Sequence, residues 1–163
     1  MTSQPDKQAT TAAYVGCAAA ASYAALKGAW ALGSTFGISD GAVFEAFIDD
    51  LGGPLVALWA TVLLALHAGA ILLSLVQPWG RRIPRRLRAS LAWLGSIMAP
   101  LGLIGLGQTI VKTIAGDPFV MLTPAIYIAV YASFTVLGLT FAFTAWRTAP
   151  RATHHPVLQG ATS

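Results

Sequence analysis

The chain has 163 residues, of which 56% are hydrophobic and only 10% are charged, and its formal net charge is +4. Soluble domains contain about 25% charged residues, so this composition excludes a soluble globular domain, whose surface needs more polar groups. It predicts an all-α integral membrane protein, because long apolar runs without strand alternation cross lipid as helices.

The first predicted span covers residues 10–32 and follows a polar segment, residues 1–9, that we expect to be disordered. The span has a small residue at every fourth position, a pattern typical of a face on which another helix packs closely. These residues are Ala12, Gly16, Ala20, Ala24 and Gly28. The partner helix belongs either to the same bundle or to a second copy of the chain in a homodimer.

Lys27 lies inside this span, where a charged group is costly. Either its side chain reaches the outer membrane surface, or it pairs with an acid of the following loop. Trp30 lies three positions further along, on the same helix face, and this favours the second explanation. The loop would then act as a lid that is attached to the first span.

The loop after the first span contains a predicted amphipathic helix, residues 41–51, whose apolar residues have helical spacing. Asp40 or Ser39 can cap the start of this helix. Its opposite side carries three acids, which are Glu45, Asp49 and Asp50. We expect the helix to lie in the outer interface or to fold over the mouth of the bundle.

The second and third predicted spans cover residues 54–77 and 89–112, and the connection between them holds five arginines. These are Arg81, Arg82, Arg85, Arg86 and Arg88. The loop between the first two spans has no Lys or Arg, so the positive-inside rule predicts a multi-pass protein of the cell membrane with both termini in the cytoplasm. Such a topology accounts for the arginines, and we predict no nucleic-acid partner.

Two further features lie within these spans. The third span has a second small-residue face, formed by Ala92, Gly95, Ala99 and Gly102, and Pro100 predicts a kink. His67 lies inside the second span, where a neutral imidazole bonded to a hydroxyl or a carbonyl is the simplest explanation. No span contains an acid that could exchange a proton with it.

The fourth predicted span covers residues 124–146, and we expect residues 149–163 to form a disordered tail. All four spans bring polar or aromatic side chains to a similar depth near their outer ends. These are Lys27, Trp30, Trp59, Gln108, Lys112, Tyr127 and Tyr131. Aromatic residues at this depth usually form an interfacial belt. The alternative is that the set lines a ligand-binding pocket under the acidic loop.

The stretch from Tyr23 to Gly37 reads YAALKGAWALGSTFG. It resembles the first-helix signature of a family of small, uncharacterised four-span membrane proteins of actinobacteria, which often reads Lys-x-x-Trp-Ala-Leu-Gly-Gly. This chain has Ser34 where the second glycine is usual. The resemblance implies a four-span layout and a shared role for Lys27 and Trp30, but no activity.

We therefore expect a four-helix transmembrane bundle that binds a lipid, an apolar small molecule or a membrane partner through an outer-leaflet pocket. The membrane partner is either another protein or a second copy of the chain in a homo-oligomer. The alternative is an intramembrane cyclase or isomerase in which Glu45, Asp49 or Asp50 protonates an isoprenoid-like substrate. An oligomeric channel or transporter ranks third, because the sequence places no charge at mid-membrane. We find no motif for a metal or a cofactor, and we predict neither.

Overall fold

The chain forms helices without β-strands among residues 7–148, which are the residues that the computed structural model describes. In chain order these are α1 (Lys7–Ala31), α2 (Gly41–Asp50), the π-helical turn η1 (Leu55–Ala60), α3 (Thr61–Val76), the 3-10 turn η2 (Pro78–Arg82), α4 (Arg85–Ser96), α5 (Met98–Ala115) and α6 (Pro124–Thr148). The predicted all-α class is confirmed.

Three helical segments of the described chain are long and apolar enough to cross a membrane: Leu55–Val76, Arg86–Ala115 and Pro124–Thr148. They correspond to the second, third and fourth predicted spans. The first predicted span, α1, is 25 residues long but is not among them. It is rich in alanine, whose side chain contributes little apolar surface.

The N-terminal prediction needs a correction. Helix α1 begins at Lys7, so residues 7–9 are helical and not disordered. The helix extends to this point because Ala9 is buried against the bundle. The remainder of the two predicted tails, residues 1–6 and 149–163, lies outside the described residues.

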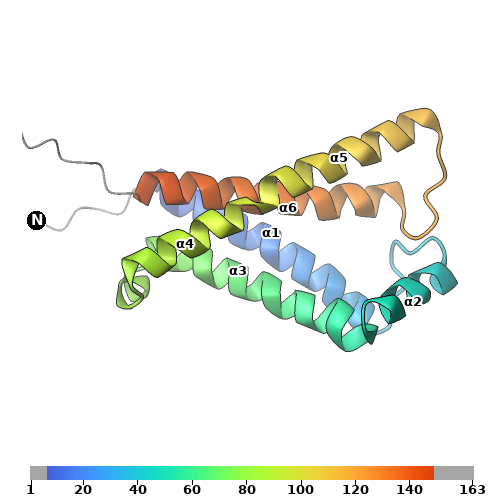
Figure 1. The fold of residues 1–163 in the computed structure, drawn as a ribbon, viewed down its shortest axis with the longest axis horizontal. Helices are drawn as coiled ribbons and strands as arrows, with labels where there is room; N and C mark the ends of the chain where they lie inside the picture. The colour runs from blue at the N-terminus through green and yellow to red at the C-terminus, as the bar shows by residue number, and fades with distance from the viewer. Residues whose placement is uncertain (1–6, 149–163) are drawn as a thin grey trace, which may run out of the picture.

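The third predicted span consists of two helices, α4 and α5, which meet at Ile97 (Figure 1). Pro100 lies in the first turn of α5. It has no backbone N–H, and its ring crowds the carbonyl group of Ser96, which ends α4. The interruption therefore lies just before the proline. Helix α4 begins at Arg85, earlier than the predicted residue 89, so the basic connection is partly helical.

The helices pack in two pairs. Helix α1 lies between α3 and α6, and α5 packs along α6. Helix α4 packs against α6 and also touches α3. Figure 1 shows the α1/α3 pair and the α5/α6 pair diverging from the end that contains α4 toward the end that contains α2. The bundle is therefore narrow at one end and splayed at the other.

Small residues lie where the helices approach most closely. A side chain on Gly16 of α1 would collide with Leu72 of α3 and Thr140 of α6. A side chain on Gly138 of α6 would collide with the backbone of Ala99 in α5. At these two positions small residues therefore pack against helices of the same chain.

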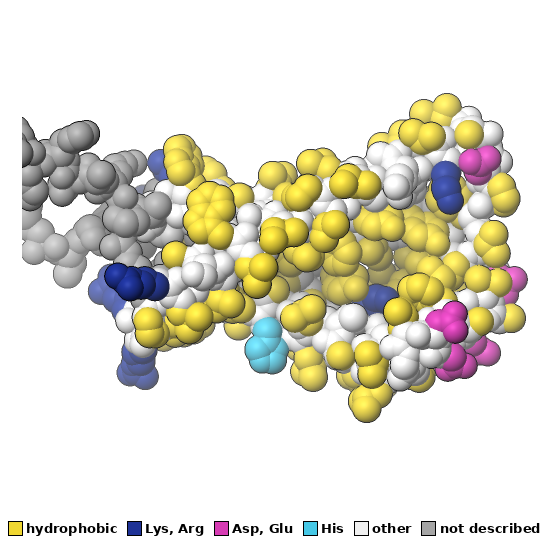
Figure 2. Space-filling view, in the orientation of Figure 1, with side chains coloured by type: hydrophobic (Ala, Val, Ile, Leu, Met, Phe, Trp, Pro, Cys, Tyr) yellow, Lys and Arg dark blue, Asp and Glu magenta, His cyan; other side chains and the backbone are white. Residues whose placement is uncertain are grey.

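Acidic side chains gather at one end of the bundle and a group of arginines at the other (Figure 2). The described acids lie in α2 or in loops at the splayed end, which we call the acidic end: Asp40, Glu45, Asp49, Asp50 and Asp117. The arginines of η2 and α4 lie at the narrow end, which we call the basic end.

Two loops join the diverging helix pairs at the acidic end. The backbone N–H of Ser39 donates to the carbonyl of Met121 at 3.0 Å, and that of Thr123 donates to the carbonyl of Gly37 at 2.9 Å. Gly37 has a φ of 73°, and a side chain on it would collide with Ile126, so only glycine suits this position. We call these contacts the loop clasp.

An apolar cluster packs beneath the loop clasp. Its buried members are Trp30, Phe44, Ile48, Ala57, Leu58, Leu122 and Ile126. They come from α1, α2, η1, α6 and the loop before α6. The carboxylate of Asp40 caps α2 by accepting hydrogen bonds from Ala42 N at 2.9 Å and Val43 N at 3.1 Å. The amphipathic helix α2 therefore packs its apolar side against the end of the bundle. This is the second of the two positions that we expected for it.

Candidate functional site

A cavity of about 370 Å³ lies at the acidic end of the α5/α6 pair. Its lining comes from α5, α6 and the loop between them: Gly105, Gln108, Thr109, Lys112, Pro118, Phe119, Val120, Met121, Tyr127 and Tyr131. Figure 2 shows a hollow, lined mainly by apolar side chains, between the two diverging helix pairs on the face in view. We call this site the acidic-end cavity.

Two tyrosines of α6 form the aromatic wall of the cavity. The rings of Tyr127 and Tyr131 are stacked, with centroids 6.3 Å apart and planes 14° apart. The ring of Phe119, from the preceding loop, lies 5.5 Å from that of Tyr127. Tyr131 packs directly on Gly105 of α5, where any side chain would collide with its ring. The two tyrosine rings are therefore fixed by contacts with the loop before α6 and with α5.

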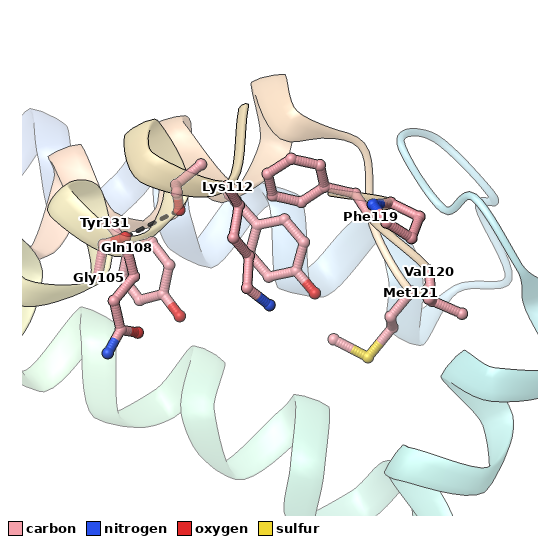
Figure 3. A pocket seen from close by; sticks show the side chains of 10 residues that line it. Gly105, Gln108, Lys112, Phe119, Val120, Met121 and Tyr131 are labelled. Atoms are coloured by element: carbon pink, nitrogen blue, oxygen red, sulfur yellow. Dashed lines mark hydrogen bonds between the residues drawn. The ribbon is translucent and has the colours of Figure 1, made fainter. Parts of the chain in front are cut away.

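Two residues of α5 form the polar side of the cavity. Gln108 and Lys112 lie one helical turn apart, and Figure 3 shows both side chains pointing from α5 in the direction of α3. The neighbouring hydroxyl of Thr109 donates to the carbonyl of Gly105 at 2.8 Å (dashed line in Figure 3). The amide of Gln108 and the ammonium of Lys112 therefore remain as the side-chain donors that α5 offers to the cavity.

Lys27 forms no ion pair with Glu45, Asp49 or Asp50 within residues 7–148. Its Nζ instead lies 5.2 Å from the ring centroid of Trp30, within α1. It also lies 6.0 Å from the ring of Tyr23, one turn earlier. No ion pair therefore joins Lys27 to α2 among the described residues, and aromatic rings lie beside this ammonium instead.

Trp30 and Trp59, which were predicted to line the pocket, lie elsewhere. Trp30 is buried in the apolar cluster, its Nε1 donates to the carbonyl of Phe36 at 2.9 Å, and its ring meets that of Phe44 edge-on at 5.3 Å. Trp59 lies in η1 and is 39% exposed on the outside of the bundle. Neither side chain is part of the cavity lining.

The three predicted catalytic acids also lie away from the cavity. Phe44 and Ile48 form the buried side of α2, so Glu45, Asp49 and Asp50 are turned outward and are exposed. None of them is part of the cavity lining. The structure therefore does not bring any of these three acids together with the aromatic wall, which is the arrangement that protonation of an apolar substrate requires.

His67 lies on the exposed surface of α3, where its Nδ1 is 2.7 Å from the carbonyl of Leu63. This is the hydrogen bond to a carbonyl that the sequence suggested. No group of three His, Cys, Asp or Glu residues in the described part of the chain is arranged to hold a metal ion.

Sequence reasoning missed the contribution of the loop before α6. Pro118, Phe119, Val120 and Met121 line the cavity. A run of apolar residues within a short loop that also contains Asp117 was the available signal, because a loop exposed only to water does not need them. Tyr23 was also missed, although it lies one helical turn before Lys27.

Comparisons with known proteins identify no relative of this chain. No family model matches it, and neither a curated protein nor a solved structure is significantly similar to it.

Proposed function

We propose that this protein crosses the membrane four times, with both termini in the cytoplasm, and binds a membrane lipid or a similar apolar molecule in the acidic-end cavity. The observation that carries the proposal is the lining of this cavity. Aromatic and apolar side chains form most of it, and Gln108 and Lys112 supply a few polar groups, a combination typical of small-molecule sites.

The packing of α1 supports a fourth span. A helix of 25 residues is about 37 Å long, enough to cross a hydrocarbon core of about 30 Å. Helix α1 lies between α3 and α6, two helices that are apolar enough to cross by themselves. Its low hydropathy matters less because the small residues of one face, Ala13, Gly16, Ala20 and Ala24, are buried against protein.

The separation of charge supports the orientation. Arginines at the basic end match the positive-inside rule for a cytoplasmic side. Thiol labelling tests this in a Cys17→Ala background, with one new cysteine at Arg82 or at Asp49, both of which are exposed. We expect a membrane-impermeant maleimide to label intact cells only at position 49. Labelling only at position 82 would reverse the orientation, and labelling at both positions would contradict a single topology.

The position of the cavity supports a lipid-like ligand. The hollow in Figure 2 lies between α3 and α5, whose large apolar side chains are exposed along their lengths. Leu63 and Leu64 of α3 and Ile110 and Val111 of α5 are all at least half exposed. In a bilayer such surfaces contact acyl chains, so the cavity is continuous with the region that lipids occupy.

Native mass spectrometry of the protein released from phosphatidylcholine nanodiscs tests lipid binding. We expect the wild-type chain to retain a lipid and Tyr131→Ala to retain much less, because the variant loses the ring that stacks on Tyr127. The control is Tyr14→Ala, since Tyr14 is 52% exposed on α1 and is not part of the cavity lining. Failure of the wild-type chain to retain lipid, or equal loss in both variants, would contradict the proposal.

The exposure of Glu45, Asp49 and Asp50 gives no support to the enzymatic alternative. A channel is likewise not favoured by any described feature. Binding is therefore the function that the site supports best.

A further inference from the structure

We infer that the ligand of the acidic-end cavity is an anionic amphiphile whose phosphate or carboxylate group is held between the ammonium groups of Lys27 and Lys112. This inference rests on the proposed function and deepens it. The two lysines belong to different helix pairs, Lys27 to α1 and Lys112 to α5. An anion between them would therefore link the two sides of the splayed end.

The side chain of Lys27 lies on the side of α1 that faces α6. Tyr127, Tyr131 and Phe134 are spaced four and three residues apart, so they share one face of α6. The first two line the cavity, and the ring of Phe134 lies 5.0 Å from that of Tyr23. Lys27 approaches this same tyrosine ring. The Lys27 ammonium therefore lies beside the contact between Tyr23 of α1 and Phe134 of α6.

The aromatic wall and the environment of Lys27 are also continuous. Tyr127 and Met121 line the cavity and pack against the apolar cluster that contains Trp30. The ring of Trp30 is the one nearest to the Lys27 Nζ, at 5.2 Å. Figure 2 shows basic side chains in and above the hollow between the helix pairs. Lys112 therefore lines the cavity, and Lys27, which is not part of the lining, lies beside a ring of the apolar cluster that adjoins it.

Neither ammonium has a carboxylate partner among residues 7–148, although acids are present at the same end of the molecule. Asp117 follows α5 but contacts Lys112 through its backbone, its N–H donating to the Lys112 carbonyl at 3.0 Å. Glu45, Asp49 and Asp50 face outward on α2. A charge at membrane depth is costly and is normally paired, and the rings of Tyr23 and Trp30 compensate only in part. A bound anion would complete the pairing.

The remaining lining indicates an amphiphile rather than a free anion. Gln108 can donate its amide N–H to a headgroup oxygen next to Lys112. Phe119, Val120 and Met121 offer no hydrogen bond to an anion but suit an acyl chain or an isoprenoid chain. A hydrated phosphate ion would have to displace its water against these side chains, which is unfavourable.

The test compares phosphatidylglycerol with phosphatidylcholine of identical acyl chains, using native mass spectrometry of protein released from mixed nanodiscs. We expect the wild-type chain to retain the anionic lipid about tenfold more than the zwitterionic one, as charge-assisted hydrogen bonds provide. Lys27→Gln and Lys112→Gln should each bring the ratio toward one. Lys7→Gln, at the opposite end of α1 and outside the cavity lining, should leave the ratio unchanged.

The outcomes separate this inference from the proposed function. Retention of both lipids in equal amounts would overturn the anionic preference and leave lipid binding intact, whereas retention of neither would overturn both. Displacement of the lipid from wild-type protein by millimolar inorganic phosphate would identify a free anion as the ligand. If Lys27→Gln shows no cooperative thermal transition, the exposed Lys112→Gln decides the matter, and an unchanged ratio in that variant overturns the inference.

Discussion

The two ends of the bundle differ most clearly at two glycines of the same helix face. Gly16 of α1 is buried, and a side chain there would collide with Leu72 and Thr140 of the neighbouring helices. Gly28 belongs to the same series of small residues at every fourth position, twelve residues after Gly16. A side chain there would meet nothing within 4 Å. One sequence pattern therefore produces a tight contact at the basic end and open space at the acidic end.

The two glycines differ in their surroundings because different residues of the neighbouring helices face this side of α1. Near Gly16 the opposing helices present a threonine and a leucine, which fit closely against a bare backbone. Nearer the acidic end the contact between α1 and α6 is aromatic, with the ring of Tyr23 against that of Phe134. Rings hold two helix axes apart, because interaxial distance depends on the side chains at the contact. Small residues allow close approach only where the partner helix presents a matching surface.

The largest expected effect compares a glycine at a close contact with the glycine in open space. Gly138→Ala should destabilise the protein by about 2 kcal/mol, because the new Cβ collides with the backbone of Ala99, which cannot rotate away. Gly28→Ala should be neutral or slightly stabilising, because its Cβ meets nothing and alanine favours a helix. Unfolding by SDS in mixed micelles, followed by circular dichroism, measures both. Equal effects would remove the contrast between the two ends.

A smaller effect is expected from the acidic end alone. Trp30→Phe removes the Nε1 donor and leaves the Phe36 carbonyl without this hydrogen bond, at a cost of about 1 kcal/mol. Hydrogen exchange should accelerate in residues 33–40 and remain unchanged at the basic end. Trp59→Phe is the matched control, because this tryptophan is partly exposed and lies outside the cluster. Faster exchange throughout the bundle would mean that the two ends do not unfold independently.

The cap of α2 sharpens the comparison further. Asp40→Ala should weaken α2 by about 0.5 kcal/mol, because the N–H groups of Ala42 and Val43 lose their acceptor. The change should appear as faster amide exchange confined to α2. Asp49→Ala removes the same charge from the same helix without removing a cap. A similar response to both substitutions would assign the effect to charge rather than to capping.

The smallest expected effect concerns the two acids that the sequence suggested as catalysts. Glu45→Gln and Asp49→Asn should leave lipid retention and thermal stability unchanged, because both side chains are exposed and lie outside the cavity lining. The native mass spectrometry and thermal melts described above suffice for this comparison. A loss of bound lipid in either variant would place α2 in the binding site after all.

Local sequence patterns predicted the positions of most helices. Which side chains of different helices come together was harder to predict. Helix α2 (Gly41–Asp50) matches the predicted amphipathic helix except for its last residue, because helical spacing and a capping aspartate are encoded within one segment. Of the seven predicted lining residues, the structure brings Gln108, Lys112, Tyr127 and Tyr131 together around one cavity. These four belong to α5 and α6, which adjoin in the chain and pack together along their lengths.

Lys27, Trp30 and Trp59 lie outside the lining of this cavity, because depth along a helix does not determine the direction of a side chain around it. Trp30 has the expected depth, but its indole binds the carbonyl of Phe36 in its own loop. Lys27 lies near α2 in depth, yet α2 buries Phe44 and Ile48 and turns its acids away. The rotation of α2 about its axis depends on the whole apolar cluster and on no short motif.

The loop clasp has a consequence for how any ligand would exchange. Since Gly37, Ser39, Met121 and Thr123 tie the tips of the helix pairs together, a molecule arriving along the bundle axis meets backbone. The remaining route runs within the plane of the bilayer. Occupancy of the cavity would then follow the mole fraction of the ligand in the surrounding leaflet rather than its concentration in water, and lateral diffusion would supply it.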